Sequence, residues 1–401
     1  MERLSRSAVA VRLEEYEEGF LAELAGLGYA SRSREAQCYL VRHLSRWLAM
    51  RGLTVSELSE GVVGQYVAAR RQERSFLRSE RALRPLLGYL RGLGIVPAAE
   101  AAMPETAGEV LLARFAAYLA GERGLAAATV SSYLFQVRPF VAAHADAARW
   151  SSLSARQVAR FAAQSAAGLR PRSAQVRANA LRALLGFMWQ EGLVVCELAG
   201  AVGSFAAPAG TAPPRGLGPG QAGDLLAAVR ASGPAGVRNE PMVALMLRLA
   251  LRAGEVAALL LEDIDWRSGV LSVRGKGNRL DQVPLPADVG QPLASYLRHG
   301  RPAGTAHRQV FLALDAPHGP LRAPAVASVA ARALARAGIT GPGAAHRLRH
   351  TAACGVLAAG GGLAEAGQLL RHTSPQATAV YAKADITALR SIARPWPGTS
   401  R

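Results

Sequence analysis

Apolar residues recur at intervals of three and four along most of the N-terminal half of the chain. This spacing is typical of amphipathic helices that bury one side. Ser or Thr residues stand where several of these segments should begin, as helix N-caps do. The pattern therefore predicts that the N-terminal half is entirely helical.

Two segments of this half resemble each other. Residues 81–89, Arg-Ala-Leu-Arg-Pro-Leu-Leu-Gly-Tyr, align with residues 179–187, Asn-Ala-Leu-Arg-Ala-Leu-Leu-Gly-Phe, and Gly94 then falls opposite Gly192. Chance likeness between Ala- and Leu-rich helices is one explanation. The shared order of these and further upstream landmarks favours a duplication.

We therefore predict two tandem helical domains, residues 1–100 and 105–205. The stretch 206–220 is rich in Pro and Gly, a composition typical of a linker. A third domain should follow at residues 221–401.

The third domain changes its hydrophobic period once. A helical pattern over 241–261 gives way to three short strand-like segments, 264–266, 270–273 and 280–285, divided by turn residues. Helical spacing resumes at about residue 323. The prediction is a mainly helical domain with a small three-stranded antiparallel sheet near its beginning.

The net charge points to a class of partner. The chain has 47 Lys and Arg residues against 29 Asp and Glu residues, a formal charge of +18. Proteins this basic most often bind nucleic acid, because arginines that neutralise phosphates release counterions. An arginine-rich genome without a special partner is the alternative, and it ranks second because the basic residues cluster.

Cysteine use and hydropathy indicate the compartment. Cys38, Cys196 and Cys354 lie far apart in apolar helical patterns, so we expect reduced core residues of a cytoplasmic protein. Residues 1–10 lack the apolar stretch of a signal peptide. Charged residues interrupt the apolar segment 242–261, so we expect no membrane span.

Candidate chemistry gathers in the third domain. His346 and Arg349 are three residues apart on a predicted helix, so they share a face and could bind the same phosphate. Arg252 lies at the end of an apolar helix and needs an anionic partner. That partner could be a ligand, although a structural pair with Glu255 is the simpler interpretation of Arg252 alone.

A tyrosine follows these residues. Tyr381 lies nine positions after His372, on a segment where Ser374 can cap a helix that begins at Pro375. A tyrosine nucleophile with arginines and histidines forms a site that can transfer a phosphoryl group without a metal. A lone tyrosine on an Ala-rich helix would usually be a core or surface residue.

Two further features have competing interpretations. His350 shares a face with His346 at the spacing of a zinc pair, but adjacent arginines would repel a cation. We therefore expect no metal, and we expect His350 to pack or cap. Lys276 lies in a glycine-flanked hairpin turn, which is usually solvated, yet could reach a DNA groove and protonate a leaving oxygen.

Taken together, these motifs resemble the tyrosine recombinase, or phage integrase, family, in its mobile-element integrase and transposase branch. The resemblance covers about residues 105–385. It implies that the two helical domains are SAM-like, core-binding-type modules, and that the third domain is the catalytic domain clamped on DNA. The matching residues are Arg252 in Leu-Arg-x-Gly-Glu, Lys276 in the hairpin, His346 and Arg349 in His-x-Leu-Arg-His-Thr, His372, and Tyr381.

The resemblance also implies a reaction and partners. Tyr381 would form a 3′-phosphotyrosyl link to DNA without a cofactor, and strand exchange would pass through a Holliday junction. Glu255 would orient Arg252. The expected partners are double-stranded DNA with specific recombination sites and a homo-tetramer on synapsed DNA, alone or with companion recombinases, in the bacterial cytoplasm at the nucleoid.

Several points stay open. Arg371 stands where the family usually has Gly, and Asp281 stands where many relatives are basic. A tail with an apolar stripe over 386–392 could dock on a neighbouring protomer or on its own domain. A type IB-like topoisomerase and a DNA-binding regulator of the same fold are alternative functions. Further candidate DNA contacts are Arg170, Arg172, Ser173, Arg177, Arg274 and Arg279.

Overall fold

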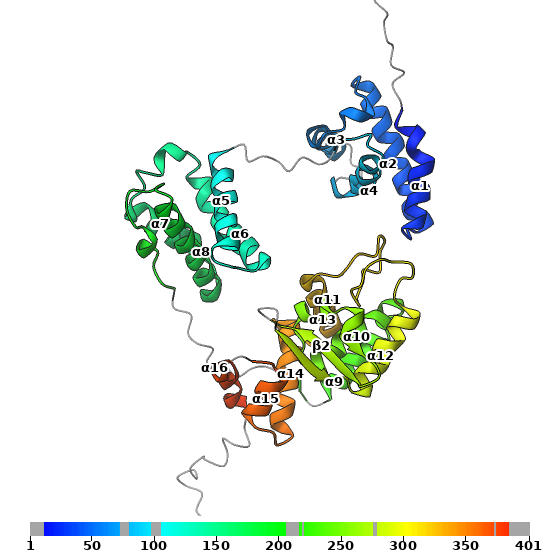
Figure 1. Ribbon diagram of the computed structural model, residues 1–401, viewed down its shortest axis with the longest axis vertical. Coiled ribbons are helices and arrows are strands. Elements are labelled where there is room, and N and C mark those ends of the chain that lie inside the picture. Colours follow the sequence, from blue (N-terminus) through cyan, green and yellow to red (C-terminus); the bar gives the residue numbers. More distant parts are fainter. Residues whose placement is uncertain are drawn as a thin grey trace, which may run out of the picture. The chain divides into compact units, whose positions relative to one another are not determined.

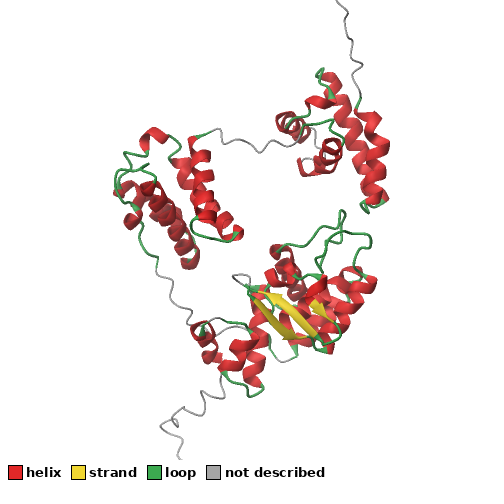
Figure 2. Ribbon diagram, viewed as in Figure 1, coloured by secondary structure: helices red, strands yellow, loops and turns green. Residues whose placement is uncertain are grey.

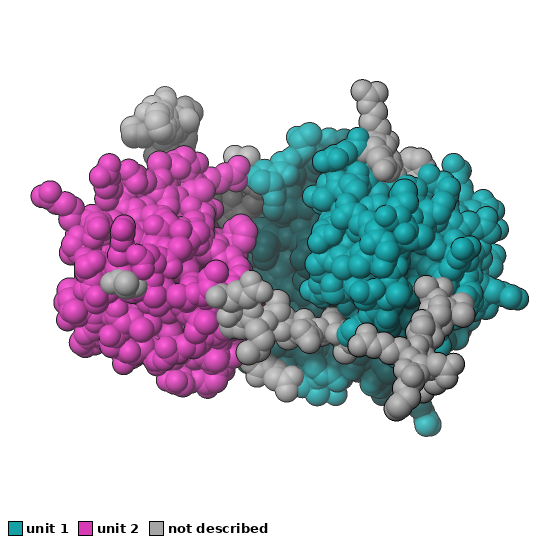
Figure 3. Space-filling view, turned by 90° about the horizontal axis from the view of Figure 1, so that it is seen from above, with its two compact units in different colours: residues 1–97, 212–401 teal, residues 98–211 magenta. Residues whose placement is uncertain are grey.

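The computed structural model describes residues 12–72, 80–97, 106–205, 216–218, 220–275, 279–372 and 374–384. The chain forms two compact units. Residues 98–211 make up one, and residues 1–97 together with 212–401 make up the other (Figure 3). Among the described residues, helices dominate both units and a small three-stranded sheet lies in the second of them, which confirms the predicted fold class (Figure 2). No helix in the described ranges is long and apolar enough to cross a membrane.

Residues 12–97 form a helical bundle with its own apolar core. Phe20, Leu44, Tyr66 and Leu86 lie in this core, contributed by four different helices. In chain order the elements are η1 (Leu13–Tyr16), α1 (Glu17–Gly26), α2 (Ser31–Met50), η2 (Val55–Glu57), α3 (Glu60–Gln72) and α4 (Glu80–Gly92).

Residues 106–205 form a second helical bundle. Thr106 and Ser154 cap helices as their sequence positions predict, because each side-chain oxygen accepts the backbone N–H three residues later. The elements are α5 (Ala107–Gly121), α6 (Ala127–Ala143), η3 (Ala147–Arg149), α7 (Ala155–Ala166), α8 (Pro171–Gln190) and η4 (Ala199–Ala201).

The two bundles share an order of elements: two helices, a 3₁₀ turn and two more helices. Figure 1 labels the helices of both bundles, α1 to α4 and α5 to α8. Positions that align in the sequence are buried in both bundles. A glycine with positive φ follows the last helix of each, Gly94 at 72° and Gly192 at 67°. The aligned buried pairs are Leu83 with Leu181, Leu86 with Leu184, and Leu90 with Met188.

Residues 220–384 form the largest helical body, around a core built from α9 to α14 and the sheet. The elements are α9 (Gln221–Arg230), α10 (Pro234–Arg248), α11 (Ala253–Ala258), η5 (Leu261–Asp263), β1 (Ile264–Asp265), β2 (Val270–Arg274), β3 (Leu280–Pro284), α12 (Ala287–His299), α13 (Ala323–Arg336), α14 (Ala344–Ala358), α15 (Leu363–Leu369), α16 (Pro375–Thr378) and η7 (Ala379–Ala384).

The sheet is antiparallel with the strand order β1-β2-β3. Leu271 of β2 pairs with Ile264 of β1 and with Val283 of β3. Leu271 and Val273 are buried on one face, as their alternation in the sequence predicts. All three predicted strands are confirmed to within two residues at each end.

A single helix over 241–261 was the wrong prediction. Helix α10 ends at Arg248, and the chain turns at Ala250, which has a φ of 52°. Arg252 then caps the short helix α11, because its backbone N–H donates to Glu255 Oε2 at 2.8 Å. Side-chain capping thus divides an apolar stretch whose periodicity alone indicates one helix.

Two further differences from the predictions concern one helix and the cysteines. Helix α12 was missed, although its buried residues Val289, Leu293 and Tyr296 have helical spacing. The cysteines do not all lie in the core: Cys196 is exposed, and the half-buried Cys38 donates its thiol proton to Glu17 at 2.9 Å. Apolar neighbours in sequence did not ensure burial of these thiols.

Candidate active site

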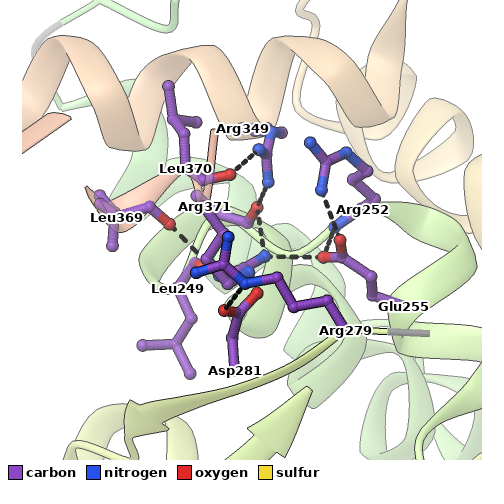
Figure 4. Close-up of polar contacts among 10 residues, drawn as sticks. Leu249, Arg252, Glu255, Arg279, Asp281, Arg349, Leu369, Leu370 and Arg371 are labelled. Carbon is purple, nitrogen blue, oxygen red and sulfur yellow. Dashed lines mark hydrogen bonds and ion pairs between the residues drawn. The ribbon is translucent and has the colours of Figure 1, made fainter. Parts of the chain in front are cut away.

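Glu255 organises the start of the site. Its Oε1 accepts a hydrogen bond from Arg252 Nη1 at 2.6 Å, and its Oε2 accepts one from Arg371 Nη2 at 2.7 Å (Figure 4). The side chains of Glu255 and Arg371 are each 5% exposed, whereas that of Arg252 is 39% exposed. The predicted Arg252–Glu255 pair is therefore present, and Arg252 still reaches solvent.

Arg371 adopts a backbone conformation that glycine favours, with a φ of 51°. Its guanidinium donates to the carbonyls of Leu249 and Leu369 at 3.2 Å, as well as to Glu255. These bonds join the turn after α15 to the segment between α10 and α11. They offset the cost of placing a side chain at a positive φ.

Arg349 lies on α14 and is almost fully buried. One terminal nitrogen donates to the carbonyl of Ala250 and the other donates to the carbonyl of Leu370 (Figure 4). Burial and the neighbouring cations Arg252 and Arg371 lower its pKa to about 10, while Glu255 and Tyr381 act in the opposite direction. The guanidinium is still charged at neutral pH.

Arg252, His346 and Arg349 line one cavity of about 530 Å³. The rest of its wall comes from small residues of α13, including Ala327 and Ser328, and from the start of α14. Two arginines and an imidazole beside an apolar wall suit a phosphate group. The structure thus places these three predicted site residues together.

Tyr381 lies in η7, just after α16, and only 2% of it is exposed. Its ring packs with Ala353, Leu357 and Leu370 in a small apolar cluster. Burial raises the pKa of Tyr381 to about 12, although the charges of Arg349 and Arg252 act to lower it. The phenol is therefore protonated at neutral pH in this state.

His350 contacts the tyrosine. Its Nδ1 lies 2.6 Å from the Tyr381 hydroxyl oxygen, and the ring centroids are 5.5 Å apart. Burial, with lesser effects of His346 and Arg349, lowers the pKa of His350. Sequence reasoning gave this residue only a packing or capping role. The i, i+4 spacing places it one turn after His346, a spacing that also matches a zinc pair and gives no sign of a contact with Tyr381.

His372 follows Arg371 in the turn after α15. Its Nδ1 lies 2.8 Å from Thr378 Oγ1. Burial and then the positive charges of Arg349, Arg252 and Arg371 lower its pKa to about 4. The ring is neutral at physiological pH and, with Nδ1 occupied by Thr378, Nε2 is the nitrogen that can meet a ligand.

His372 and Arg371 also line a second cavity, of about 710 Å³, between β3 and the helices α15 and α16. Helix α16 begins at Pro375 as predicted, with Ser374 at the N-cap position, although the Ser374 side chain makes no capping bond. Tyr381 lies in the 3₁₀ segment after this helix rather than on the helix itself.

Three of the six other candidate DNA contacts are already engaged within the protein. Arg177 donates from Nε to Gln136 Oε1 at 3.0 Å and from Nη1 to the carbonyl of Ser165. Arg274 pairs with Asp263 at 2.6 Å, and Arg279 pairs with Asp281 at 3.0 Å. Arg170, Arg172 and Ser173 surround the N-terminus of α8 and are exposed.

Lys276 and the tail beyond residue 384 lie outside the described residues. Among the residues that the structure does describe, no group of three or more His, Cys, Asp or Glu side chains could hold a metal ion.

Comparisons with known proteins identify the family. Residues 217–387 match the phage integrase family, and residues 112–192 match the phage integrase N-terminal SAM-like domain. The Sinorhizobium fredii protein y4rA, named as an integrase/recombinase, is 35% identical over 387 residues, which span 95% of this chain and 94% of that protein.

Two solved structures share the fold. A lambda integrase dimer bound to a COC′ core site has a TM-score of 0.54 at 18% identity, over 73% of this chain and 98% of that chain. The Tn1549 transposon integrase in complex with circular intermediate DNA has a TM-score of 0.52 at 16% identity, over 71% of this chain and 99% of that chain. The family models and y4rA confirm the resemblance seen in the sequence: the chain belongs to the phage integrase family of tyrosine recombinases.

Proposed function

We propose that this recombinase cuts and rejoins DNA at specific sites through a 3′-phosphotyrosyl intermediate and a Holliday junction. The observation that carries the proposal is the shared cavity of Arg252, His346 and Arg349, with Tyr381 close enough for its pKa to respond to both arginines. Two guanidinium groups and an imidazole suit the charge that develops on a phosphate under attack.

Each residue has a role in the proposed step. The oxygen of Tyr381 attacks phosphorus, and the bond from phosphorus to the 5′ oxygen breaks. Arg252 and Arg349 stabilise the non-bridging oxygens, and His372 donates from Nε2. Lys276 protonates the departing 5′ oxygen, and His346 binds the phosphate or assists proton transfer. Glu255 orients Arg252.

The link to Tyr381 conserves the phosphoester, so neither a nucleotide cofactor nor a metal is required by this chemistry. In the second half of the reaction the 5′ hydroxyl of a partner strand attacks the phosphotyrosine. Release of Tyr381 completes one strand exchange, and a second round resolves the junction.

DNA binding rests on charge and on the helical bundles. The formal charge of +18 favours a polyanionic partner. We infer SAM-like modules at 1–100 and 105–205, a linker at 206–220 and a catalytic domain at 221–401. Exposed Arg170, Arg172 and Ser173 would contact the duplex backbone. Arg274 and Arg279 pair with Asp263 and Asp281 but keep 40% and 63% of their side chains exposed, so they could add contacts, whereas Arg177 is held by Gln136 and Ser165.

The biological setting is also proposed. The Tn1549 relative is a transposon integrase in complex with circular intermediate DNA, and y4rA is named as an integrase/recombinase, so we infer movement or integration of a mobile element. A tetramer on two synapsed sites would perform the exchange. Companion recombinases could complete this assembly.

The test uses a duplex with a nick just beyond the cleavage site. Cleavage then releases a short fragment that carries the 5′ hydroxyl, so rejoining cannot occur and the covalent complex accumulates. Because the recognition sequence must be supplied, the duplex is drawn from the DNA that flanks the gene. Wild-type protein should form the complex, Tyr381→Phe should not, and both should bind the duplex equally. Tyr39→Phe, at an exposed tyrosine, is the matched control. A covalent complex in Tyr381→Phe would refute the nucleophile, and relaxation of plasmids without a defined site would favour a topoisomerase.

A further inference from the structure

We propose that His350 is a catalytic residue that accepts the phenolic proton of Tyr381 when the tyrosine attacks DNA. The inference rests on the proposed function and deepens it, because it assigns the proton acceptor to a histidine other than His346. It also replaces the packing or capping role expected from the sequence.

The geometry is that of a nucleophile and its base. His350 lies on α14 and Tyr381 lies on η7, and the two elements bring Nδ1 to 2.6 Å from the hydroxyl oxygen. The ring planes are inclined at 56°. A candidate base must be within hydrogen-bond reach of the proton it removes, and this pair meets that condition directly.

Tyr381 needs such an acceptor. The phenol is buried in an apolar cluster, and burial raises its pKa to about 12 despite the nearby arginines. A phenolate is thus not available in advance at neutral pH, so the proton must leave during the attack.

His350 can take that proton. The histidine is half-buried, and burial together with the charges of its neighbours lowers its pKa, so a free imidazole is present at neutral pH. The titratable and charged groups that act on the pair are His346 and Arg349 of α14, His372 of the turn after α15, and Arg252; Cys354, one turn further along α14, acts on Tyr381.

The other histidine of α14 faces elsewhere. His346 is exposed and lines the cavity with Arg252 and Arg349, and neither His350 nor Tyr381 contributes to that wall. The two rings lie 6.5 Å apart along the helix. This arrangement separates two tasks: His346 meets the phosphate, and His350 meets the nucleophile.

The step balances as follows. The O–H bond of Tyr381 breaks, its proton moves to His350 Nδ1, and a lone pair of the phenolic oxygen forms the bond to phosphorus. The electron pair of the cleaved P–O bond stays on the 5′ oxygen, which takes its proton from Lys276. In rejoining, the 5′ hydroxyl returns that proton to Lys276, and Tyr381 recovers its own from His350 as it leaves.

The test first replaces His350 and then makes Tyr381 acidic enough to react without a base. His350→Ala should slow single-turnover formation of the covalent complex by roughly 10²- to 10⁴-fold without weakening binding to the DNA. His350→Asn, which keeps a polar side chain but cannot take a proton, should be equally slow. Replacing Tyr381 by 2,3,5-trifluorotyrosine, a much stronger acid, should restore most of the rate in both variants.

His346→Ala is the matched control, because its defect should persist with trifluorotyrosine. Wild-type cleavage rates in His350→Ala, or a defect that trifluorotyrosine does not relieve, would overturn the proposal. If the wild-type protein itself forms no covalent complex, the proposed function is refuted instead. Nitrogen NMR of the free protein gives an independent arm: Nδ1 must be the unprotonated nitrogen of His350, and a proton found on Nδ1 would overturn the assignment.

Discussion

Arg371 and Glu255 form a buried ion pair, 2.7 Å long, between residues far apart in the chain. Because Arg252 binds the other oxygen of the same carboxylate, one glutamate sets the positions of two arginines. The pKa of Glu255 lies below its usual value: burial alone would raise it, but the backbone N–H of Arg252 and the charges of Arg371 and Arg252 outweigh burial. Glu255 is therefore ionised at neutral pH.

Glu255→Gln should destabilise the protein, because it leaves the buried guanidinium of Arg371 without its counter-charge. Breaking one side of a buried pair costs about 3 to 5 kcal/mol. Urea unfolding at pH 7 measures the change. Since the folded-state pKa is lowered, the stabilisation is present above the unfolded pKa and is lost as the pH falls through the folded pKa. Equal stability of wild type and Glu255→Gln at pH 7 would contradict the role of this pair.

Arg371→Gly tests the effect of the Arg371 charge apart from that of its backbone conformation. Glycine suits the φ of 51°, but it removes the partner of Glu255 and one of the cations that lower the pKa of His372. We therefore expect His372 to titrate at a higher pH than in the wild type, which NMR of the imidazole can follow. Arg371→Lys should keep the titration closer to that of the wild type. An unchanged His372 titration in Arg371→Gly would show that Arg371 does not act on the site.

Arg349→Ala should slow cleavage at saturating DNA. The transition state should lose roughly 2.7 to 4 kcal/mol of stabilisation, as it does when other anion-hole donors are removed. Arg349→Lys should recover part of this loss, because the charge remains but one ammonium cannot bond the carbonyls of Ala250 and Leu370 in the same way. The exposed Arg298→Lys serves as the control. Normal single-turnover rates in Arg349→Ala would exclude the residue from the reaction.

Local patterns predicted what local interactions determine. The alternation of buried and exposed residues in the three strands, and the shared face of His346 and Arg349 on α14, each depend only on the sequence of one segment, so the sequence predicted them. Contacts between distant segments were beyond such reasoning. The break after α10 depends on Ala250 with positive φ and on the Arg252 cap, and the contact of His350 with Tyr381 exists only once η7 packs on α14.

Arg172 and Arg177 should behave differently, although both were candidate DNA contacts. Arg177 is bonded to Gln136 and Ser165, so Arg177→Ala should lower the free energy of unfolding of the unit formed by residues 98–211. Arg172 is exposed, so Arg172→Ala should leave stability unchanged and reduce the salt dependence of DNA affinity by about one phosphate contact. Thermal unfolding and a salt series of binding measurements distinguish the two. Equal loss of stability in both variants would contradict this division.

Acid should destabilise the folded protein through His372. An unperturbed histidine has a pKa of 6.5, whereas the pKa of His372 in the fold is about 4, so between these values the unfolded chain binds more protons than the folded one. Stability therefore rises as the pH increases from about 4 to about 6.5, and the contribution of His372 is constant above that window. His372→Asn should flatten this part of the profile, measured as urea midpoints against pH, whereas His299→Asn, at an exposed histidine of α12, should not. Profiles of equal slope in wild type and His372→Asn would mean that His372 titrates in the fold as it does in water.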